Sequence, residues 1–262
     1  MKTILVGIDF TKSSENSLNY AIKIAEQSHS KILLFHALTA PMVHANSGLF
    51  FIAVNNITKN SEQKMIELQA QLCANYKNIK FEVEITYEGI RNKVETLSKT
   101  HKISFVVLGL EVKNKLLKFL NGTTSLDLIG KINCPIITVP SKYKNHQIKK
   151  MIIALELIKP IGLKISNRIY SIIKTLSVEH EFVHIKTNED VNMKQLNYKH
   201  LNIIEFNAQS LETGIKTYAK KSNADLIMVI SHNYSTLHNL FKETDSQKII
   251  LSSSIPIISI HN

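Results

Sequence analysis

The chain of 262 residues contains little cysteine, almost no arginine and no long apolar run. Arg91 and Arg168 are its only arginines, although 32 basic against 21 acidic residues give a net charge of +11. Proteins that read nucleic acids favour arginine, because its planar guanidinium forms paired hydrogen bonds with bases and phosphates. We therefore interpret the positive charge as a lysine-rich, solvated surface and expect no nucleic-acid partner.

The small number of cysteines and the lack of a long apolar segment indicate in which cellular compartment the protein folds. Cys73 and Cys134 are the only cysteines, and the chain opens on Lys2 and a strand-like run rather than on the apolar stretch of a secretory signal. The longest uncharged apolar run, residues 49–54, is far shorter than the roughly 20 residues of a membrane-spanning helix. We expect a reduced cytoplasmic protein without disulfides and without a membrane partner.

Apolar strands and amphipathic helices alternate along the first half of the chain. Residues 4–9, ILVGID, form an apolar run that closes on a carboxylate, as is typical of a strand buried in a parallel sheet. A polar stretch of helix-capping residues follows, and apolar residues then recur at helical spacing. Further strands are predicted at 31–38, 81–86, 105–110 and 135–139, with helices around 65–72 and 90–97. The pattern predicts an α/β fold with an open parallel sheet.

The second half of the chain repeats the first. Residues 151–156, MIIALE, match ILVGID at an offset of 147 (156 minus 9), whereas Pro256 matches Pro135 at an offset of 121. The difference, 147 minus 121, is 26 residues, which is about one helix with its loops. We therefore expect the second copy to lack the helix around 65–72.

Two copies predict two tandem open parallel-sheet domains of the Rossmann-like type. We place the first domain at residues 1–143 and the second, shortened one at residues 148–262. Each is large enough to bury a core of its own. The polar stretch SKYKNHQ at 141–147 lies between the copies and is the candidate linker.

The repeat also decides how HEFVH, residues 180–184, is interpreted. It has the H-E-x-x-H form of zinc peptidases, in which two histidines one helical turn apart bind one metal ion. His184, however, lies 148 residues after His36, near the end of a predicted strand. Residues four apart on a strand are separated by about 13 Å, which is too far for both to bind one zinc ion. We expect a chance match on a strand and no metal site.

A glycine-containing crossover follows the predicted strand at 105–110. Gly109 ends that strand, and Gly122 with Thr123 opens the next predicted helix, whose free N–H groups and dipole suit a phosphate. Ligands bind open parallel sheets at the carboxyl ends of the strands, which is also where Asp9 lies. A helix cap is the alternative explanation for such glycine and hydroxyl residues.

With these features the chain resembles the universal stress protein family over both halves. Besides ILVGID and the Ser/Thr-rich helix start, the resemblance rests on His36-Ala37 and Cys134-Pro135-Ile136. The nucleotide-binding branch of that family carries G-x-x-G, nine residues and then G-[S/T] in the crossover. Gly109 and Gly122-Thr123 match this pattern, whereas Val112 replaces the second glycine.

The resemblance implies that ATP or another adenine nucleotide binds in the first half, with magnesium only as a companion of the nucleotide. Asp9 would contact the adenosine moiety, and Gly109 would let the backbone approach the ligand. The phosphates would be held by Gly122, Thr123 and Ser125. Val112 opposes binding if the missing glycine needed positive φ or close approach to phosphate.

The second copy departs further from the nucleotide-binding pattern. Glu156 replaces Asp9, and the three loop glycines are replaced by Ile230, Asn233 and Glu243. A carboxylate at the helix start would repel phosphate. We therefore expect the second copy to be a structural partner.

Assembly follows from the same resemblance. Domains of the family pair through their last strands, and residues 136–139 and 257–260 are apolar enough to pair at an otherwise exposed sheet edge. We expect an intramolecular pair that resembles a covalently linked dimer, and a homodimer of two chains stays open.

The resemblance implies a regulatory protein of the stress response. We expect it not to be an enzyme, because the sequence has no paired nucleophile and base. Slow ATP hydrolysis is the remaining catalytic alternative. A nucleotide-free interaction module is the competing hypothesis, and Val112 and the second copy favour it. Residues 40–56, treated as part of a loop, are apolar enough to suggest a lid, a partner surface or a covered loop.

Overall fold

The computed structural model describes residues 1–38, 48–87, 90–111, 132–145, 147–155, 161–187, 201–231, 250 and 253–261. The elements of the first half are β1 (Thr3–Gly7), α1 (Lys12–Ser28), β2 (Lys31–Ala37), α2 (Gly48–Asn75), β3 (Phe81–Thr86), α3 (Ile90–Thr100), β4 (Ile103–Leu110) and β5 (Ile136–Pro140). Those of the second half are β6 (Lys150–Ala154), α5 (Leu163–Leu176), β7 (Glu179–Lys186), β8 (Ile203–Asn207), α6 (Leu211–Lys221), β9 (Leu226–Ser231) and β10 (Ile257–His261).

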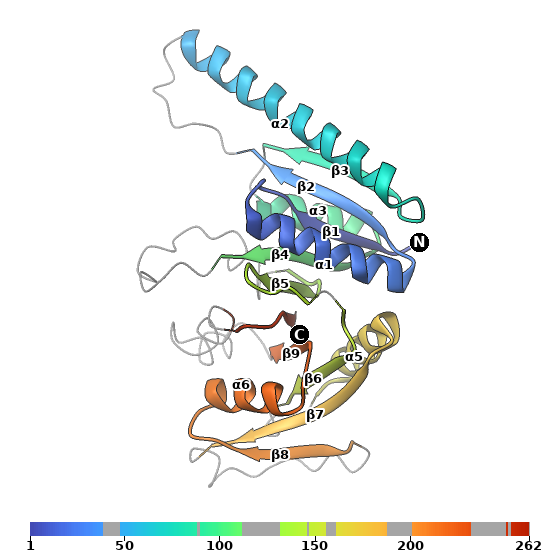
Figure 1. Ribbon diagram of the computed structural model, residues 1–262, viewed down its shortest axis with the longest axis vertical. Helices are drawn as coiled ribbons and strands as arrows, with labels where there is room; N and C mark the ends of the chain where they lie inside the picture. The colour runs from blue at the N-terminus through green and yellow to red at the C-terminus, as the bar shows by residue number, and fades with distance from the viewer. Residues whose placement is uncertain are drawn as a thin grey trace.

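The strands form one open sheet along the long axis of the molecule (Figure 1). Its order is β3-β2-β1-β4-β5-β10-β9-β6-β7-β8. Every pair of neighbours is parallel except β5 and β10, in which Thr138 lies opposite Ile257 and Ile136 opposite Ser259. The predicted α/β class with open parallel sheets is confirmed, and the two edge strands singled out in the sequence are hydrogen-bonded to each other.

Helices cover both faces of the sheet because successive strand residues point to opposite sides. In β1, Ile4 belongs to the core under α1, whereas Leu5 belongs to the core under α3. In β6, Ile153 and Ile152 divide in the same way between the cores under α5 and α6. The core under α1 continues into the second half, where α1 contacts α5. The two halves therefore share one hydrophobic core on that face.

The repeated elements occur in the same order in both halves. Thus β6, α5, β7, β8, α6, β9 and β10 follow the order of β1, α1, β2, β3, α3, β4 and β5. Between β7 and β8 the structure describes no counterpart of α2, although residues 188–200 are outside the described ranges. The tandem pattern read from the sequence therefore matches the order of the elements.

The helix α2 begins earlier than the sequence analysis placed it. It spans 28 residues from Gly48, so residues 48–56 are helical and their assignment to a loop is wrong. The physical reason is that residues 49–75 contain neither proline nor glycine, which leaves no residue to break the helix.

Among the helices that the structure describes, none combines the length and the apolarity needed to cross a membrane.

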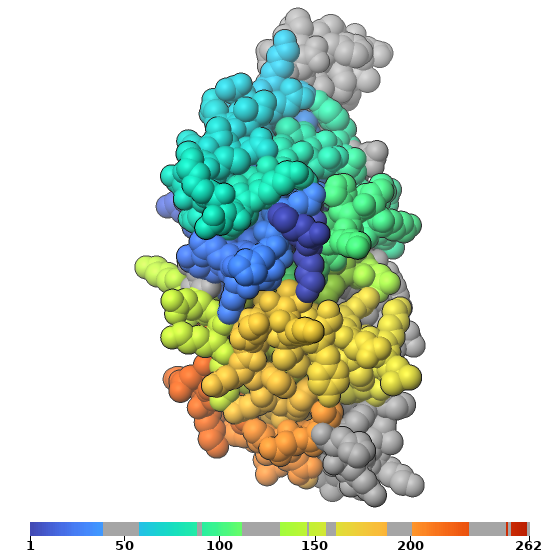
Figure 2. Space-filling model, turned by 90° about the vertical axis from the view of Figure 1, so that its right-hand side faces the viewer, coloured from blue at the N-terminus to red at the C-terminus, as the bar shows by residue number. Residues whose placement is uncertain are grey.

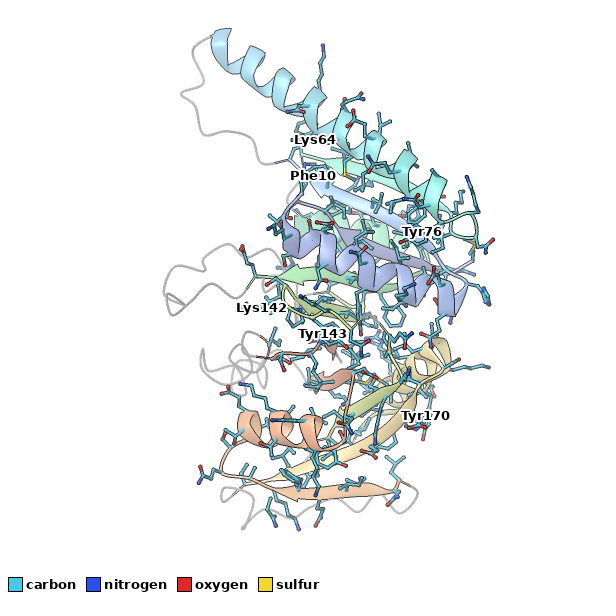
Figure 3. All side chains as sticks on the ribbon, viewed as in Figure 1. Phe10, Lys64, Tyr76, Lys142, Tyr143 and Tyr170 are labelled. Atoms are coloured by element: carbon cyan, nitrogen blue, oxygen red, sulfur yellow. The ribbon has the colours of Figure 1, made fainter. Side chains whose placement is uncertain are left out.

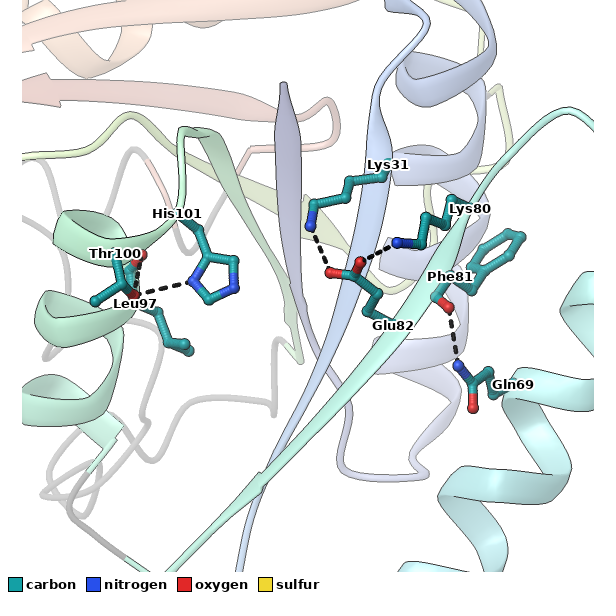
Figure 4. A network of polar contacts seen from close by, with 8 residues as sticks. All are labelled: Lys31, Gln69, Lys80, Phe81, Glu82, Leu97, Thr100 and His101. Carbon is teal, nitrogen blue, oxygen red and sulfur yellow. Dashed lines mark hydrogen bonds and ion pairs between the residues drawn. The ribbon is translucent and has the colours of Figure 1, made fainter. Parts of the chain in front are cut away.

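Polar contacts attach α2 to the outermost strand β3 (Figure 4). Gln69 Nε2 donates a hydrogen bond to the carbonyl oxygen of Phe81 over 2.8 Å. On the same strand, the Glu82 carboxylate lies 2.5 Å from Lys31 Nζ and 2.7 Å from Lys80 Nζ. Hydrogen bonds from these two lysines hold the pKa of Glu82 below its usual range. The outer strand is thus joined to β2 and to α2 by side chains as well as by backbone.

The predicted linker at 141–147 is docked on the second half. Tyr143 is buried and its hydroxyl donates to the carbonyl oxygen of Asp225 over 3.2 Å. The Asp225 carboxylate accepts the amides of Lys149 and Lys150 over 2.9 and 3.1 Å. Asp225, directly before β9, therefore anchors the connection between the halves.

HEFVH lies inside β7, which confirms the predicted strand. His180 is exposed, whereas His184 is buried. Glu181 lies 2.7 Å from Lys150 Nζ and accepts a hydrogen bond from the Tyr218 hydroxyl over 2.9 Å. The contact with Lys150 holds the pKa of Glu181 below its usual range, while burial and Glu181 raise the pKa of Tyr218 to about 12. The glutamate of the motif is therefore part of a structural network.

Candidate functional site

The first strand of the sheet leads to a carboxylate at the start of α1. Oδ1 of Asp9 accepts hydrogen bonds from the amide of Thr11 over 2.9 Å and from its hydroxyl over 2.5 Å. Thr11 is the N-cap of α1 and its Oγ1 accepts the amide of Ser14. Partial burial raises the pKa of Asp9, but the hydrogen bonds from Thr11 outweigh it and hold the pKa below its usual range. Asp9 is therefore an ionised, exposed acceptor at the carboxyl end of β1.

Phe10 follows Asp9 in a left-handed backbone conformation, with φ of 61°. Its ring packs on His36 at the end of β2, with centroids 5.2 Å apart. Lys64 Nζ of α2 lies 5.7 Å from the centre of the same ring, and Figure 3 labels both residues. The Phe10 side chain nevertheless stays 41% exposed. A left-handed residue other than glycine costs about 1–2 kcal/mol, and such strain is concentrated at functional positions.

His36 is held by the backbone of the neighbouring strand. Its Nδ1 lies 2.7 Å from the carbonyl oxygen of Ile8. Because a carbonyl oxygen only accepts, Nδ1 carries the proton, and in the neutral ring Nε2 is left as an acceptor. This bond fixes the ring on which Phe10 packs and gives a structural role to the histidine that ends the strand.

Gly109 lies on β4 against the first turn of α1. A Cβ atom built on it would lie 2.4 Å from the backbone oxygen of Ser13 and 2.6 Å from its Oγ. Any larger residue would therefore push α1 away from the sheet. The buried Oγ of Ser13 has no hydrogen-bond partner within the part of the chain that the structure describes. Gly109 thus lets α1 pack closely on the sheet. Its expected role of letting the backbone approach a ligand stays a prediction.

The structure brings together only some of the residues expected to bind a nucleotide. Asp9 and Gly109 both border the first turn of α1, from β1 and β4. Gly122, Thr123 and Ser125 lie outside the described residues, as does Val112. In the second copy Ile230 is the penultimate residue of β9, whereas Glu156, Asn233 and Glu243 lie outside the described ranges.

Within the residues that the structure describes, no three His, Cys, Asp or Glu side chains are grouped as a metal site requires. Cys73 and Cys134 are free cysteines. Burial raises the pKa of the Cys134 thiol to about 12, so it is protonated near neutral pH and a poor nucleophile.

Sequence reasoning missed three features of this edge. These are Phe10, Ser13 and the contact of the His36 ring with Phe10. Phe10 directly follows the carboxylate that closes ILVGID, and an aromatic residue at a strand-to-helix turn is the signal that could have found it. Ser13 was hidden among several capping residues. The edge as a whole presents a carboxylate, an aromatic face near an ammonium group and a buried hydroxyl.

Comparison with known proteins places this geometry in context. The family model of the universal stress protein family matches residues 1–140. The fold is similar to that of a universal stress protein from Archaeoglobus fulgidus, with a TM-score of 0.71 and 14% identity over 99% of this chain and 98% of the other. A functionally unknown protein from Pseudomonas aeruginosa matches with a TM-score of 0.59 and 12% identity, over 99% of this chain and 92% of the other.

A further similarity is to the cytoplasmic domain of a prokaryotic cation chloride cotransporter. Its TM-score is 0.50 at 10% identity, over 98% of this chain and 94% of the other. At such identities the structural matches show the shared fold alone. A search of curated protein sequences finds no match.

Proposed function

Because this chain belongs to the universal stress protein family, we propose that its first half binds an adenine nucleotide at the carboxyl ends of β1 and β4. ATP is the first candidate, with magnesium only as its companion. The single observation that carries the proposal is the juxtaposition of Asp9 and Gly109 at the first turn of α1. Ligands of open parallel sheets bind at this edge.

The side chains around Asp9 support a nucleoside rather than a bare ion. The ionised Asp9 carboxylate is a strong acceptor for ribose hydroxyls or an exocyclic amine. The exposed ring of Phe10 is an aromatic face of the kind on which bases stack. Lys64, beside that ring, adds positive charge. In this proposal Gly122, Thr123 and Ser125 hold the phosphates, and Gly109 keeps α1 close enough for its first turn to take part.

We also propose that the two halves, residues 1–143 and 148–262, act as a covalently linked pair of domains. The antiparallel pairing of β5 with β10 and the core that α1 shares with α5 support it. Thr138 Oγ1 adds a hydrogen bond to the carbonyl oxygen of Ile257 over 3.3 Å. A change that a nucleotide causes in the first half would then reach the second half through this ladder, which suits a regulatory, non-catalytic protein.

The nucleotide proposal is tested by calorimetric titration of nucleotide-stripped protein with ATP. Gly122→Glu copies the second half, in which Glu243 stands at this position. The matched control is Gly162→Glu, because Gly162 is the N-cap of α5, as Gly122 is predicted to open a helix, and a Cβ at Gly162 meets nothing within 4 Å. We expect binding near one site per chain that is lost in Gly122→Glu and kept in Gly162→Glu. Absence of binding by the wild-type protein at millimolar ATP contradicts the proposal.

A second candidate function, a nucleotide-free interaction module, is favoured by two contacts. Gly109 is explained by Ser13, and Asp9 by its hydrogen bonds to Thr11, so neither residue needs a ligand to account for it. Thermal unfolding with and without ATP separates the two functions, because a ligand that binds only the folded state raises the unfolding temperature. An unchanged unfolding temperature, together with no calorimetric signal, would favour the interaction module.

A further inference from the structure

A groove of about 350 Å³ lies between the two halves at the amino ends of β1 and β4, which we call the seam groove. Lys2 and Lys102 line it from the first half, and Arg168, Ser171 and Thr175 of α5 line it from the second. In Figure 2 the dark blue N-terminal residues lie directly against the yellow segment that contains α5. The seam groove is therefore at the opposite edge of the sheet from Asp9 and Gly109.

The charged residues in the described lining of the seam groove are all basic. Lys2, Lys102 and Arg168 line it, and the described lining includes no aspartate or glutamate. Neither lysine forms an ion pair within the described ranges of the chain. A cleft lined by one sign of charge concentrates its field and attracts counter-ions. Two of the three cations come from residues 100 positions apart in sequence (102 minus 2), and the third comes from the other half.

Neutral oxygen atoms position two of these cations. Lys2 Nζ donates to Thr175 Oγ1 over 2.6 Å, and Arg168 Nη2 donates to Asn133 Oδ1 over 2.8 Å. Both bonds orient a charged group, and the acceptor oxygen of each bond carries no formal charge. Lys2 and Thr175 belong to different halves, as do Arg168 and Asn133, so each bond also ties one half to the other.

Hydroxyl and apolar groups complete the lining. Ser104 and Ser171 can donate hydrogen bonds, and the guanidinium fork of Arg168 suits two oxygens of one phosphate. Ile103 and Ile172 add an apolar part to the wall. Cations, hydroxyl donors and an apolar wall together match a phosphate group that carries a small organic moiety.

We propose that the seam groove binds a phosphate monoester of a small molecule, with the phosphate between Lys2, Lys102 and Arg168. The bound phosphate joins the two halves, because its cationic partners come from both. This site is separate from the nucleotide site proposed above and does not depend on it.

The test is an NMR titration of the full chain with inorganic phosphate and with phenyl phosphate, at ionic strength held constant with sodium chloride. Ser171→Glu places a carboxylate in the groove, three residues after Arg168, where it can also pair with that arginine and keep α5 stable. Asn167→Glu is the matched control, because Asn167 is exposed on the same helix and does not line the groove.

We expect saturable shifts of amides around Lys2, Lys102 and Ser171. Ser171→Glu should weaken phosphate binding by about tenfold or more, whereas Asn167→Glu should leave it within about twofold of wild type. Phenyl phosphate should bind more tightly than inorganic phosphate because of the apolar wall. Equal weakening in both variants would show a diffuse charge effect and overturn the proposal, as would shifts elsewhere or no saturation at millimolar phosphate.

A second pair of variants guards against failure of Ser171→Glu to fold. Lys102→Gln removes one cation from the groove, and Lys99→Gln removes one from the nearby end of α3 that does not line it. Weaker binding only in Lys102→Gln supports the site, and equal binding in the two variants contradicts it. Gly122→Glu, which tests the nucleotide site, should leave phosphate binding here unchanged, so the two proposals fail separately.

Discussion

The Nδ1 atom of His184 lies 3.0 Å from the carbonyl oxygen of Leu155. The first half has the same contact at equivalent positions, between His36 Nδ1 and the carbonyl oxygen of Ile8 over 2.7 Å. In both halves a histidine near the end of one strand thus holds the backbone just beyond the neighbouring strand. The second histidine of HEFVH therefore belongs to the repeat, and its ring is bonded to the backbone at Leu155.

This contact predicts that the two histidines of HEFVH differ in their effect on stability. His184 is 3% exposed, so His184→Ala leaves a cavity and an unsatisfied Leu155 carbonyl and should lower the free energy of unfolding by about 2–3 kcal/mol. His180→Ala removes an exposed side chain and should change it by less than about 0.5 kcal/mol. Urea unfolding measures the free energy of unfolding of both variants, and EDTA should change neither value. Equal losses of stability in the two variants, together with destabilisation of the wild-type protein by EDTA, would instead indicate a metal site.

Gly109→Ala should destabilise the protein by about 1–3 kcal/mol, because its new Cβ would lie 2.4 Å from the backbone oxygen of Ser13. Gly162→Ala is the control, since a Cβ there meets nothing within 4 Å. Alanine caps a helix less well than glycine, but it also restricts the unfolded chain, and these two effects on the free energy of unfolding oppose each other. We therefore expect that free energy to change by less than about 0.5 kcal/mol. Thermal unfolding without nucleotide measures both. If Gly109→Ala were as stable as wild type, the glycine would have to be explained by a ligand.

Stability should fall at acid pH partly through Glu181. The hydrogen bond from Lys150 lowers the pKa of this carboxyl in the folded protein below its ordinary value of 4.5. The unfolded chain then takes up the proton first, so the contribution to stability is present above pH 4.5 and is lost as the pH falls through the folded pKa. Glu181→Gln should therefore flatten the acid limb of unfolding free energy against pH. Glu179 is exposed on the same strand and lies outside the network, so Glu179→Gln should keep the wild-type slope of unfolding free energy against pH. Identical slopes in the wild-type protein and in Glu181→Gln would refute the prediction.

Ser177→Gly should stabilise the protein by about 0.5–1 kcal/mol, because Ser177 caps α5 at φ of 49°, a conformation that glycine adopts without strain. Ser222 caps α6 at φ of −84°, where glycine only adds freedom to the unfolded chain. Each hydroxyl donates one similar bond of 3.3 Å to a backbone carbonyl. The difference in unfolding free energy between the two variants, measured with denaturant, therefore reports the relief of backbone strain at Ser177. Stabilisation by Ser222→Gly would contradict this explanation.

Most strands of the sheet could be predicted because burial leaves a local trace. The run at 4–9 is apolar because β1 is covered on both faces, and such a run needs no knowledge of its neighbours to be recognised. The start of α2 was misplaced because residues 48–56 carry no helix-start signal of their own. The candidate site was only partly predictable: Asp9 was found from its place after a strand, but Phe10 depends on a left-handed turn that the residue type does not announce.

The amino-acid sequence by itself determined the α/β class, the tandem repeat and the strand that contains HEFVH. Periodic burial can be recognised within each segment, and a repeat can be recognised by comparing two segments of one sequence. The tertiary structure alone decided what those residues touch. Gly109 meets Ser13, and Lys2, Lys102 and Arg168 meet at the seam groove, although Lys2 and Arg168 lie 166 positions apart in sequence (168 minus 2). Such contacts arise only when the sheet brings distant strands and helices together, so no local pattern encodes them.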